Sequence, residues 1–171
     1  MNLEQAAENV INYVDELISQ PARYKLVLIV GQDETTRSAV IGEVTRRAAY
    51  PVLDVGIELS RELMLIPEAR RPLKASSVFK ALVGKCSQSS AVVVDNIGLL
   101  FDSSLQLSPL DLVEDVSRVT PLVVSWPGAV TFHDDGTVHT LSHANPDNDE
   151  YRIYSHVQTA AVVNLDTEGA Q

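Results

Sequence analysis

The segment at residues 25–44, KLVLIVGQDETTRSAVIGEV, most constrains what this chain can fold into. An apolar run, Leu26 to Val30, leads directly into Gly31, a short polar turn follows, and a helical pattern occupies 38–49. A continuous apolar run of this length is typical of a parallel strand buried on both faces. The segment therefore predicts a strand, a glycine-led loop and a helix, which is the outline of a phosphate-binding loop.

The remainder of the chain repeats this alternation of strands and helices. An amphipathic helix is predicted over 2–19, and Pro67 interrupts the helical stretch after the second strand. We expect further strands over 51–59, 91–96 and 121–128, the last ending at Pro127 and Gly128, and further helices from Ala75 to Cys86 and over 108–119. In the helix over 108–119, Ser108 is the expected cap and Pro109 occupies the first turn.

Alternating strands and helices predict an α/β fold, a P-loop NTPase-like three-layer sandwich with a mainly parallel sheet. The tail differs, because two alternating runs surround Asp135-Gly136 and predict a C-terminal β-hairpin. Residues 151–165 are expected to form one last strand. We predict one domain, 1–171, made of an N-terminal helix (1–20), an α/β core (24–128), a hairpin and strand (129–165) and a frayed tail (166–171).

The loop itself departs from the phosphate-binding consensus GxxxxGK[ST] at two positions. Gly31, the spacing and Ser38 match the consensus, whereas Thr36 replaces the second glycine and Arg37 replaces the lysine. In an intact loop, backbone N–H groups surround the phosphates, the lysine reaches the outer phosphates and the hydroxyl binds Mg²⁺. The candidate nucleotide-binding residues are thus Gly31, Thr35, Thr36, Arg37 and Ser38.

Each departure disfavours tight ATP binding. A Thr36 forced to positive φ would cost about 1–2 kcal/mol, and Arg37 is a planar fork rather than a compact ammonium. Asp33 and Glu34 add two carboxylates where a polyanion would bind. We expect Glu34 to be able to pair with Arg37 and fill the empty loop.

The second half of a nucleotide site is better preserved. The strand at 91–95 ends in Asp95, as does the strand that holds magnesium in P-loop NTPases. Asn96 follows where an active ATPase would carry a water-activating glutamate, and an amide cannot act as that base. Ser125 and Trp126 end the next strand, where a sensor of the γ-phosphate would lie, although core packing is the explanation we favour for Trp126. ATP with Mg²⁺, held by Asp95 and Ser38, is the cofactor these residues suggest.

In the sequence, the histidines and the single cysteine offer little further chemistry. His133, His139 and His143 lie on the predicted hairpin, either as a loose metal cluster or, the reading we favour, as surface histidines, because structural zinc ligands follow tighter patterns. The single Cys86 excludes an internal disulfide and is compatible with a reducing compartment. No apolar run approaches the roughly 20 residues that cross a bilayer, and no signal-peptide pattern is present, so we expect a cytoplasmic protein.

Charge is distributed unevenly along the chain, whose formal net charge is −10. Residues 37–85 contain nine basic and five acidic residues, and the remainder contains four basic and eighteen acidic ones. The overall acidity argues against direct DNA binding, which depends on neutralising phosphates. The segment 37–85 forms either a solvated face or a functional basic patch.

Several of these segments together resemble one family. VGIELSRELMLIPEARRPL, VVVDNIGLLFDSSLQLSPLDLVEDVSR, LVVSWPG and DEYRIY are similar to segments of the BrxF family, the small P-loop protein of BREX type 3 phage-defence systems. The resemblance spans about Leu26 to Tyr154. It implies a P-loop fold, ATP binding, loop and magnesium roles for Gly31, Arg37, Ser38 and Asp95, and a cytoplasmic accessory role in antiviral defence, with other proteins of the defence complex as partners.

Three functions are compatible with these observations. The first is a P-loop-fold accessory protein with a degenerate nucleotide site (Walker A motif) that acts through protein partners. The second is an ATPase that becomes active only in an oligomer or with a partner that supplies the missing catalytic group. The third is an acidic protein that mimics DNA or blocks a nucleic-acid-binding surface.

Overall fold

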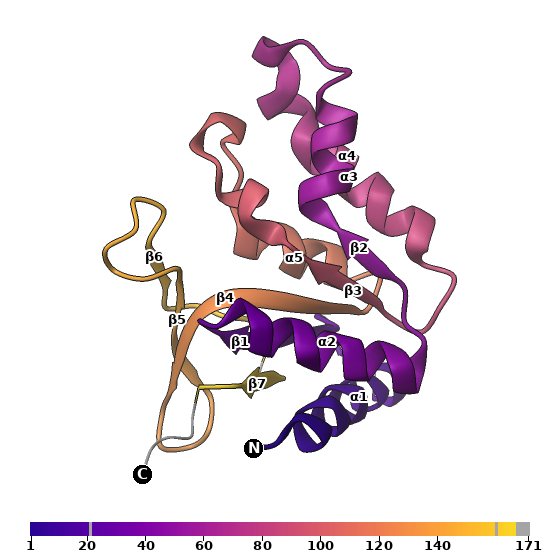
Figure 1. The fold of residues 1–171 in the computed structure, drawn as a ribbon, viewed down its shortest axis with the longest axis vertical. Helices are drawn as coiled ribbons and strands as arrows, with labels where there is room; N and C mark the ends of the chain where they lie inside the picture. Colours follow the sequence, from indigo (N-terminus) through magenta and orange to yellow (C-terminus); the bar gives the residue numbers. More distant parts are fainter. Residues whose placement is uncertain (21, 160, 167–171) are drawn as a thin grey trace.

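The computed structural model describes residues 1–20, 22–159 and 161–166. A seven-stranded sheet runs through the molecule, and its five central strands are parallel in the order β2-β3-β4-β1-β7 (Figure 1). The strands are β1 (Leu26–Gly31), β2 (Val52–Asp54), β3 (Val92–Asp95), β4 (Leu122–Phe132), β5 (Val138–His143), β6 (Arg152–Tyr154) and β7 (Val162–Asn164). The predicted α/β class and mainly parallel sheet are confirmed.

Helices cover both faces of this sheet. One face packs against α1 (Leu3–Ser19) and α2 (Glu34–Ala48). The other packs against α3 (Val55–Leu63), α4 (Arg71–Cys86), α5 (Pro109–Ser117) and the short 3₁₀ helices η2 (Ile97–Phe101) and η3 (Ser103–Leu105). A further 3₁₀ helix, η1 (Glu68–Arg70), directly precedes α4 and buries none of its residues. Along β1, Val27 and Ile29 join the first core, and Leu28 and Val30 join the second. This two-sided burial is why the strand sequence is uninterruptedly apolar.

The N-terminal helix forms where the sequence predicts it. Asn2 caps α1, since its side chain accepts a hydrogen bond of 2.8 Å from the backbone N–H of Gln5. Ala6, Ala7, Val10 and Val14 form its buried face. Among the described residues, none of the helices combines the length and the apolarity that crossing a membrane requires.

Two element boundaries differ from the prediction. The strand expected over 51–59 ends at Asp54, whose carboxylate accepts a hydrogen bond of 3.0 Å from the N–H of Ile57 and starts α3. The helix expected from Ala75 begins at Arg71, with Pro72 in its first turn, a position that does not need an N–H donor. The predicted cap position Ser108 and first-turn Pro109 are confirmed, but the Ser108 hydroxyl donates to Asp111.

The predicted end of the fourth strand at Pro127 and Gly128 is wrong. β4 continues through both residues to Phe132, and its second half pairs with β5 in the predicted hairpin around Asp135-Gly136. A Cβ atom at position 128 would lie 1.8 Å from the carbonyl oxygen of Ser142, so glycine is required for the close approach of β5.

The single last strand expected over 151–165 is also wrong. This segment forms β6, which extends the hairpin, and β7, which lies parallel to β1 on the central sheet. The central sheet thus includes residues of the predicted C-terminal part, 129–165. Of the predicted frayed tail, only Asp166 is among the described residues, and 167–171 lie outside them.

The close contact at Gly128 predicts a stability difference between two glycine substitutions. Gly128→Ala should lower the free energy of unfolding by about 1–3 kcal/mol, because the new methyl group overpacks the β4–β5 contact. Gly42→Ala is the matched control: nothing lies within 4 Å of a Cβ there, and alanine in α2 should add about 0.5–1 kcal/mol. Urea unfolding measures both, and an equal response of the two variants would contradict the assigned pairing.

Candidate functional site

The candidate site lies where the carboxyl ends of β1, β2, β3 and β4 meet. A pocket of about 310 Å³ opens there, and polar side chains from all four strand ends or the turns after them face it. Open α/β sheets bind ligands in this kind of crevice, beyond the carboxyl ends of the strands. The described lining residues are Glu34, Arg37, Asp54, Asp95, Asn96, Ile97, Gly98, Ser125 and Pro127.

The phosphate-loop segment does not form a wide loop. Only Gln32 and Asp33 separate β1 from α2, which begins at Glu34, four residues before the predicted start at Ser38. Thr36 therefore lies in the first helical turn and is not among the residues with positive φ. The positive φ whose cost was considered for Thr36 is therefore avoided, because Asp33 caps the helix early and removes the bend that needed a second glycine.

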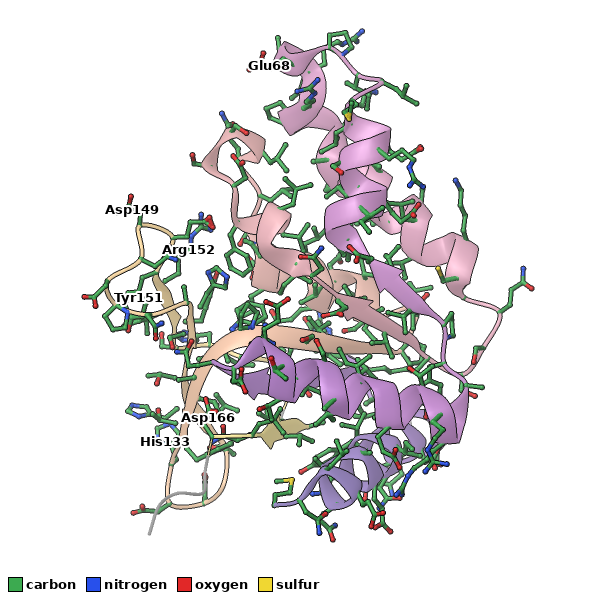
Figure 2. All side chains as sticks on the ribbon, viewed as in Figure 1. Glu68, His133, Asp149, Tyr151, Arg152 and Asp166 are labelled. Carbon is green, nitrogen blue, oxygen red and sulfur yellow. The ribbon has the colours of Figure 1, made fainter. Side chains whose placement is uncertain are left out.

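Carboxylates occupy backbone donors of this turn. Asp33 accepts hydrogen bonds from the N–H of Thr35 at 3.2 Å and from the hydroxyl of Thr36 at 2.5 Å. These two bonds, that of the hydroxyl first, lower the pKa of Asp33 below its usual value. Asp166, after β7, accepts a hydrogen bond of 3.0 Å from the N–H of Gln32 (Figure 2 labels Asp166). The positions that a bound phosphate would take at a helix start are thus held by the chain's own anions.

The Arg37 side chain is hydrogen-bonded to the ends of β1 and β4 beside this turn. Its Nη1 donates to the Gly31 carbonyl at 2.6 Å and its Nε donates to the Ser125 hydroxyl at 3.0 Å. The side chain is buried, which lowers its pKa, and the Asp95 carboxylate is the opposite charge that acts on it most strongly. The pairing considered for Arg37 and Glu34 is not observed: among the described residues they form no ion pair, although the charge of Glu34 partly offsets the lowering of the Arg37 pKa by burial.

The two residues expected to hold Mg²⁺ are placed differently. Asp95 lies at the end of β3 and lines the pocket. Ser38 is exposed on α2 and is not among the described lining residues, and Thr35 is likewise exposed in the first turn of α2. The arrangement therefore offers Asp95 to a ligand without the hydroxyl that would complete a phosphate-bound magnesium site.

The Asn96 side chain is hydrogen-bonded to Asp54. Its backbone is left-handed, with φ 55°, and its Nδ2 donates to Asp54 at 2.8 Å. A Cβ atom on Gly56 would lie 2.3 Å from that Nδ2, and the Gly56 N–H donates to the Asn96 carbonyl at 3.0 Å. Sequence reasoning missed Asp54 and Gly56 because it placed both inside a strand. The short β2, ending in an Asp that is followed by a helical apolar pattern, was the available signal.

Ser125 and Trp126 point to opposite faces of the sheet, as neighbours on a strand do. Ser125 reaches the site and accepts the bond from Arg37. Trp126 is fully buried, donates from Nε1 to the Ser142 carbonyl at 2.9 Å, and makes an edge-on contact with Phe101. Core packing, the explanation favoured for Trp126, is the observed arrangement, and Trp126 is not among the described residues that line the pocket.

The three histidines of the hairpin do not converge. His133 and His139 have ring centroids 4.4 Å apart, whereas His143 stacks on Phe101 in the core. Burial lowers the pKa of His143. The surface position favoured for all three is therefore wrong for His143. In the part of the chain that the structure covers, no group of three His, Cys, Asp or Glu side chains is placed to hold a metal.

Comparison with known proteins returns no match: no family model, curated protein or solved structure is similar to this chain. The site must therefore be interpreted from its own geometry. That geometry is a pocket with three carboxylates at its rim, a buried guanidinium that is already hydrogen-bonded, and a helix start that is already capped.

The role of Arg37 predicts its sensitivity to a charge-conserving change. Arg37→Lys should lower the free energy of unfolding by about 1–3 kcal/mol, because one ammonium cannot satisfy both the Gly31 carbonyl and the Ser125 hydroxyl. Arg46→Lys is the control, since that side chain is exposed and pairs only with Glu43, and it should change stability by less than about 0.5 kcal/mol. Chemical unfolding at neutral pH compares them, and a silent Arg37→Lys would contradict the bridging role.

Proposed function

We propose that this chain is a P-loop-type domain whose phosphate site is closed, and that it acts as a non-catalytic protein component. Two features support a P-loop origin. A buried strand ending in Gly31 leads into α2, and a second strand, two places away in the sheet, ends in Asp95 at the same edge. The two candidate halves of a nucleotide site thus border one pocket.

The observation that carries the proposal is the seat of Arg37 between Gly31 and Ser125. In a working loop the cation at this position extends toward the outer phosphates. Here the guanidinium instead donates hydrogen bonds to the Gly31 carbonyl at the end of β1 and to the Ser125 hydroxyl of β4. A nucleotide would need to break both bonds and displace the carboxylates of Asp33 and Asp166 from the turn. The residues present therefore do not fit a bound triphosphate.

The biological setting of the proposal comes from the resemblance to the BrxF family. It supports a cytoplasmic accessory protein in a bacterial defence complex, with the other proteins of that complex as partners. A closed nucleotide site suits such a role, because the fold then supplies surfaces rather than turnover.

Calorimetry with ATP and Mg²⁺ tests the proposal on the intact protein. We expect no binding heat and no phosphate release, and the same result for Asp95→Ala and for the control Asp149→Ala, a loop residue outside the pocket. Sub-micromolar binding with steady turnover that Asp95→Ala abolishes and Asp149→Ala preserves would overturn it. That outcome would favour the ATPase alternative.

A further inference from the structure

Two histidines of the β4–β5 hairpin lie in contact on its solvent-exposed face. His133 directly follows β4 and His139 lies in β5, and their ring centroids are 4.4 Å apart with the ring planes tilted by 45°. Both residues are exposed (Figure 2 labels His133). Among the described residues, the histidine rings with hydrogen-bond partners are those of His143 and His156. The nitrogens of two adjacent imidazoles therefore remain available to a ligand.

A β-bulge in β5 creates this contact. The pairing of β4 with β5 shifts between Thr131 and Phe132, so that Phe132 lies opposite Val138 and His139 is left without a partner residue. In an unbroken register His139 would lie opposite Phe132. Because side chains alternate along a strand, that register would put His139 on the opposite face of the hairpin from His133.

The pattern of burial along β5 shows the effect of the bulge. Leu141 and His143 are buried, and strict alternation would place His139 on the same face as both. Instead His139 is exposed, and Val138 packs against the core in its place. Bulges redirect side chains in this way and are frequent next to functional sites.

The chain around the two histidines is acidic. Residues 129–151 contain five Asp or Glu residues and no Lys or Arg. Asp134 and Asp135 directly follow His133 in the turn, and Asp135 accepts hydrogen bonds from the N–H of Thr137 at 2.9 Å and from its hydroxyl at 2.6 Å. A concentration of negative charge of this kind attracts cations to the hairpin.

We infer that His133 and His139 form a binding site for a divalent transition-metal ion of the Zn²⁺ or Ni²⁺ type. Imidazole nitrogen is a preferred ligand of these ions, whereas Mg²⁺ and Ca²⁺ prefer oxygen. The ion would join β4 to β5 across the bulge. This inference does not depend on whether the phosphate loop is closed.

Such a site is open rather than closed. Structural zinc sites use four protein ligands, and no group of three or more is placed to hold a metal in the described part of the chain. With His133 and His139 as the two protein ligands, the remaining coordination positions of the ion fall to water or to a donor atom of another molecule. The site is therefore expected to exchange its metal rather than to depend on it for folding.

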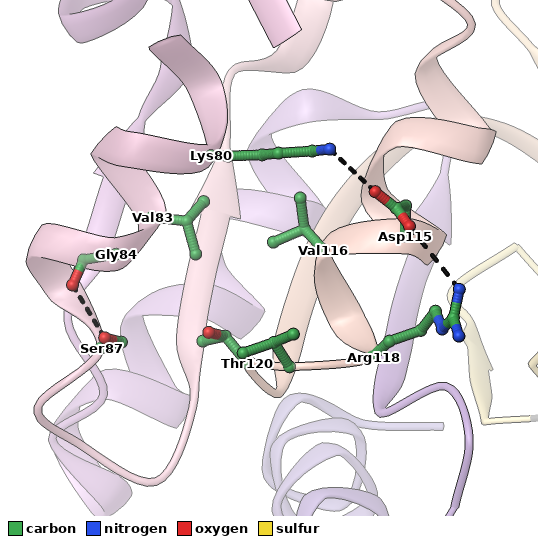
Figure 3. Close-up of a pocket in the computed structure, with 9 residues that line it drawn as sticks. Lys80, Val83, Gly84, Ser87, Asp115, Val116, Arg118 and Thr120 are labelled. Carbon is green, nitrogen blue, oxygen red and sulfur yellow. Dashed lines mark hydrogen bonds and ion pairs between the residues drawn. The ribbon is translucent and has the colours of Figure 1, made fainter. Parts of the chain in front are cut away.

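Two other places where carboxylates line a pocket are less suited to a cation. Beside the groove of about 650 Å³ between α4 and α5, Asp115 is already paired with Lys80 at 2.9 Å and with Arg118 at 3.9 Å (Figure 3). In the candidate site, the charge of the Arg37 guanidinium already acts on Asp95. At both places a cation of the chain itself competes with an added ion.

Calorimetric titration of the full chain with Zn²⁺ and with Ni²⁺, each alone, tests the inference. The wild type should bind about one ion per chain, and Mg²⁺ or Ca²⁺ should give no binding heat. His133→Ala and His139→Ala should each weaken binding by about tenfold or more, since the loss of an outer-shell partner alone costs 10–100-fold. The double variant should bind little more weakly than either single variant, because each substitution already removes the chelating pair.

His156→Ala is the matched control, since His156 is exposed and lies outside the hairpin. It should bind as the wild type does, and circular dichroism verifies that every variant folds. Paramagnetic Ni²⁺ locates the site independently: amide signals of residues 131–140 should broaden first in nuclear magnetic resonance spectra, and those beside His156 and Cys86 should stay sharp.

Four results would overturn the inference. The first is a wild type without saturable binding of Zn²⁺ or Ni²⁺. The second is binding that His133→Ala and His139→Ala leave unchanged, or that His156→Ala weakens equally. The third is equal binding of Mg²⁺ or Ca²⁺, which would assign the ion to the carboxylates. The fourth is broadening centred outside residues 131–140.

Discussion

The two hydrogen bonds from Arg37 to Gly31 and Ser125 are the interaction on which the arrangement of the candidate site depends. The Arg37 guanidinium joins the first turn of α2 to the ends of β1 and β4, three elements that also share a buried apolar cluster further from the site. A buried cation is costly unless its donors are satisfied, and here a carbonyl and a hydroxyl satisfy them within a field of nearby carboxylates. Since both bonds use the Arg37 guanidinium, holding these elements together and binding a phosphate would compete for the same side chain.

The early helix start strengthens this closure. Asp33 is an effective N-cap, so α2 gains a turn that a phosphate-binding loop would leave unwound. The exposed donors at a helix start carry partial positive charge and attract anions. Two carboxylates of the chain itself accept bonds from N–H groups here: Asp33 from Thr35, and Asp166 from Gln32. The residues that depart from the consensus thus act together: threonine suits a helical turn, and arginine suits a bridge.

The sequence was sufficient for the central elements and insufficient where local and distant forces compete. β1 and β3 could be predicted because burial on both faces demands an unbroken apolar run. The β2–α3 boundary could not, since VGIEL fits a strand as well as a helix until the capping bond of Asp54 is seen. β4 continues beyond Pro127 because its second half pairs with β5, which approaches Gly128 closely. That pairing is a tertiary contact, so the local sequence did not predict it. The contact from Asp166 to Gln32 joins residues 134 positions apart, and no local pattern encodes it.

The charges, too, can be counted in the sequence, but their positions in space depend on the fold. The basic stretch at 37–85 could be counted in the sequence, yet it does not form one patch, because Arg37 is buried and Arg46 and Arg47 are paired with Glu43. Its other exposed basic residues are spread over α3, η1 and α4, and the sheet separates them from the acidic α1. At the strand ends, by contrast, the described basic side chain, Arg37, is buried and already hydrogen-bonded, so the basic charges that stay exposed lie on the helices that cover the sheet.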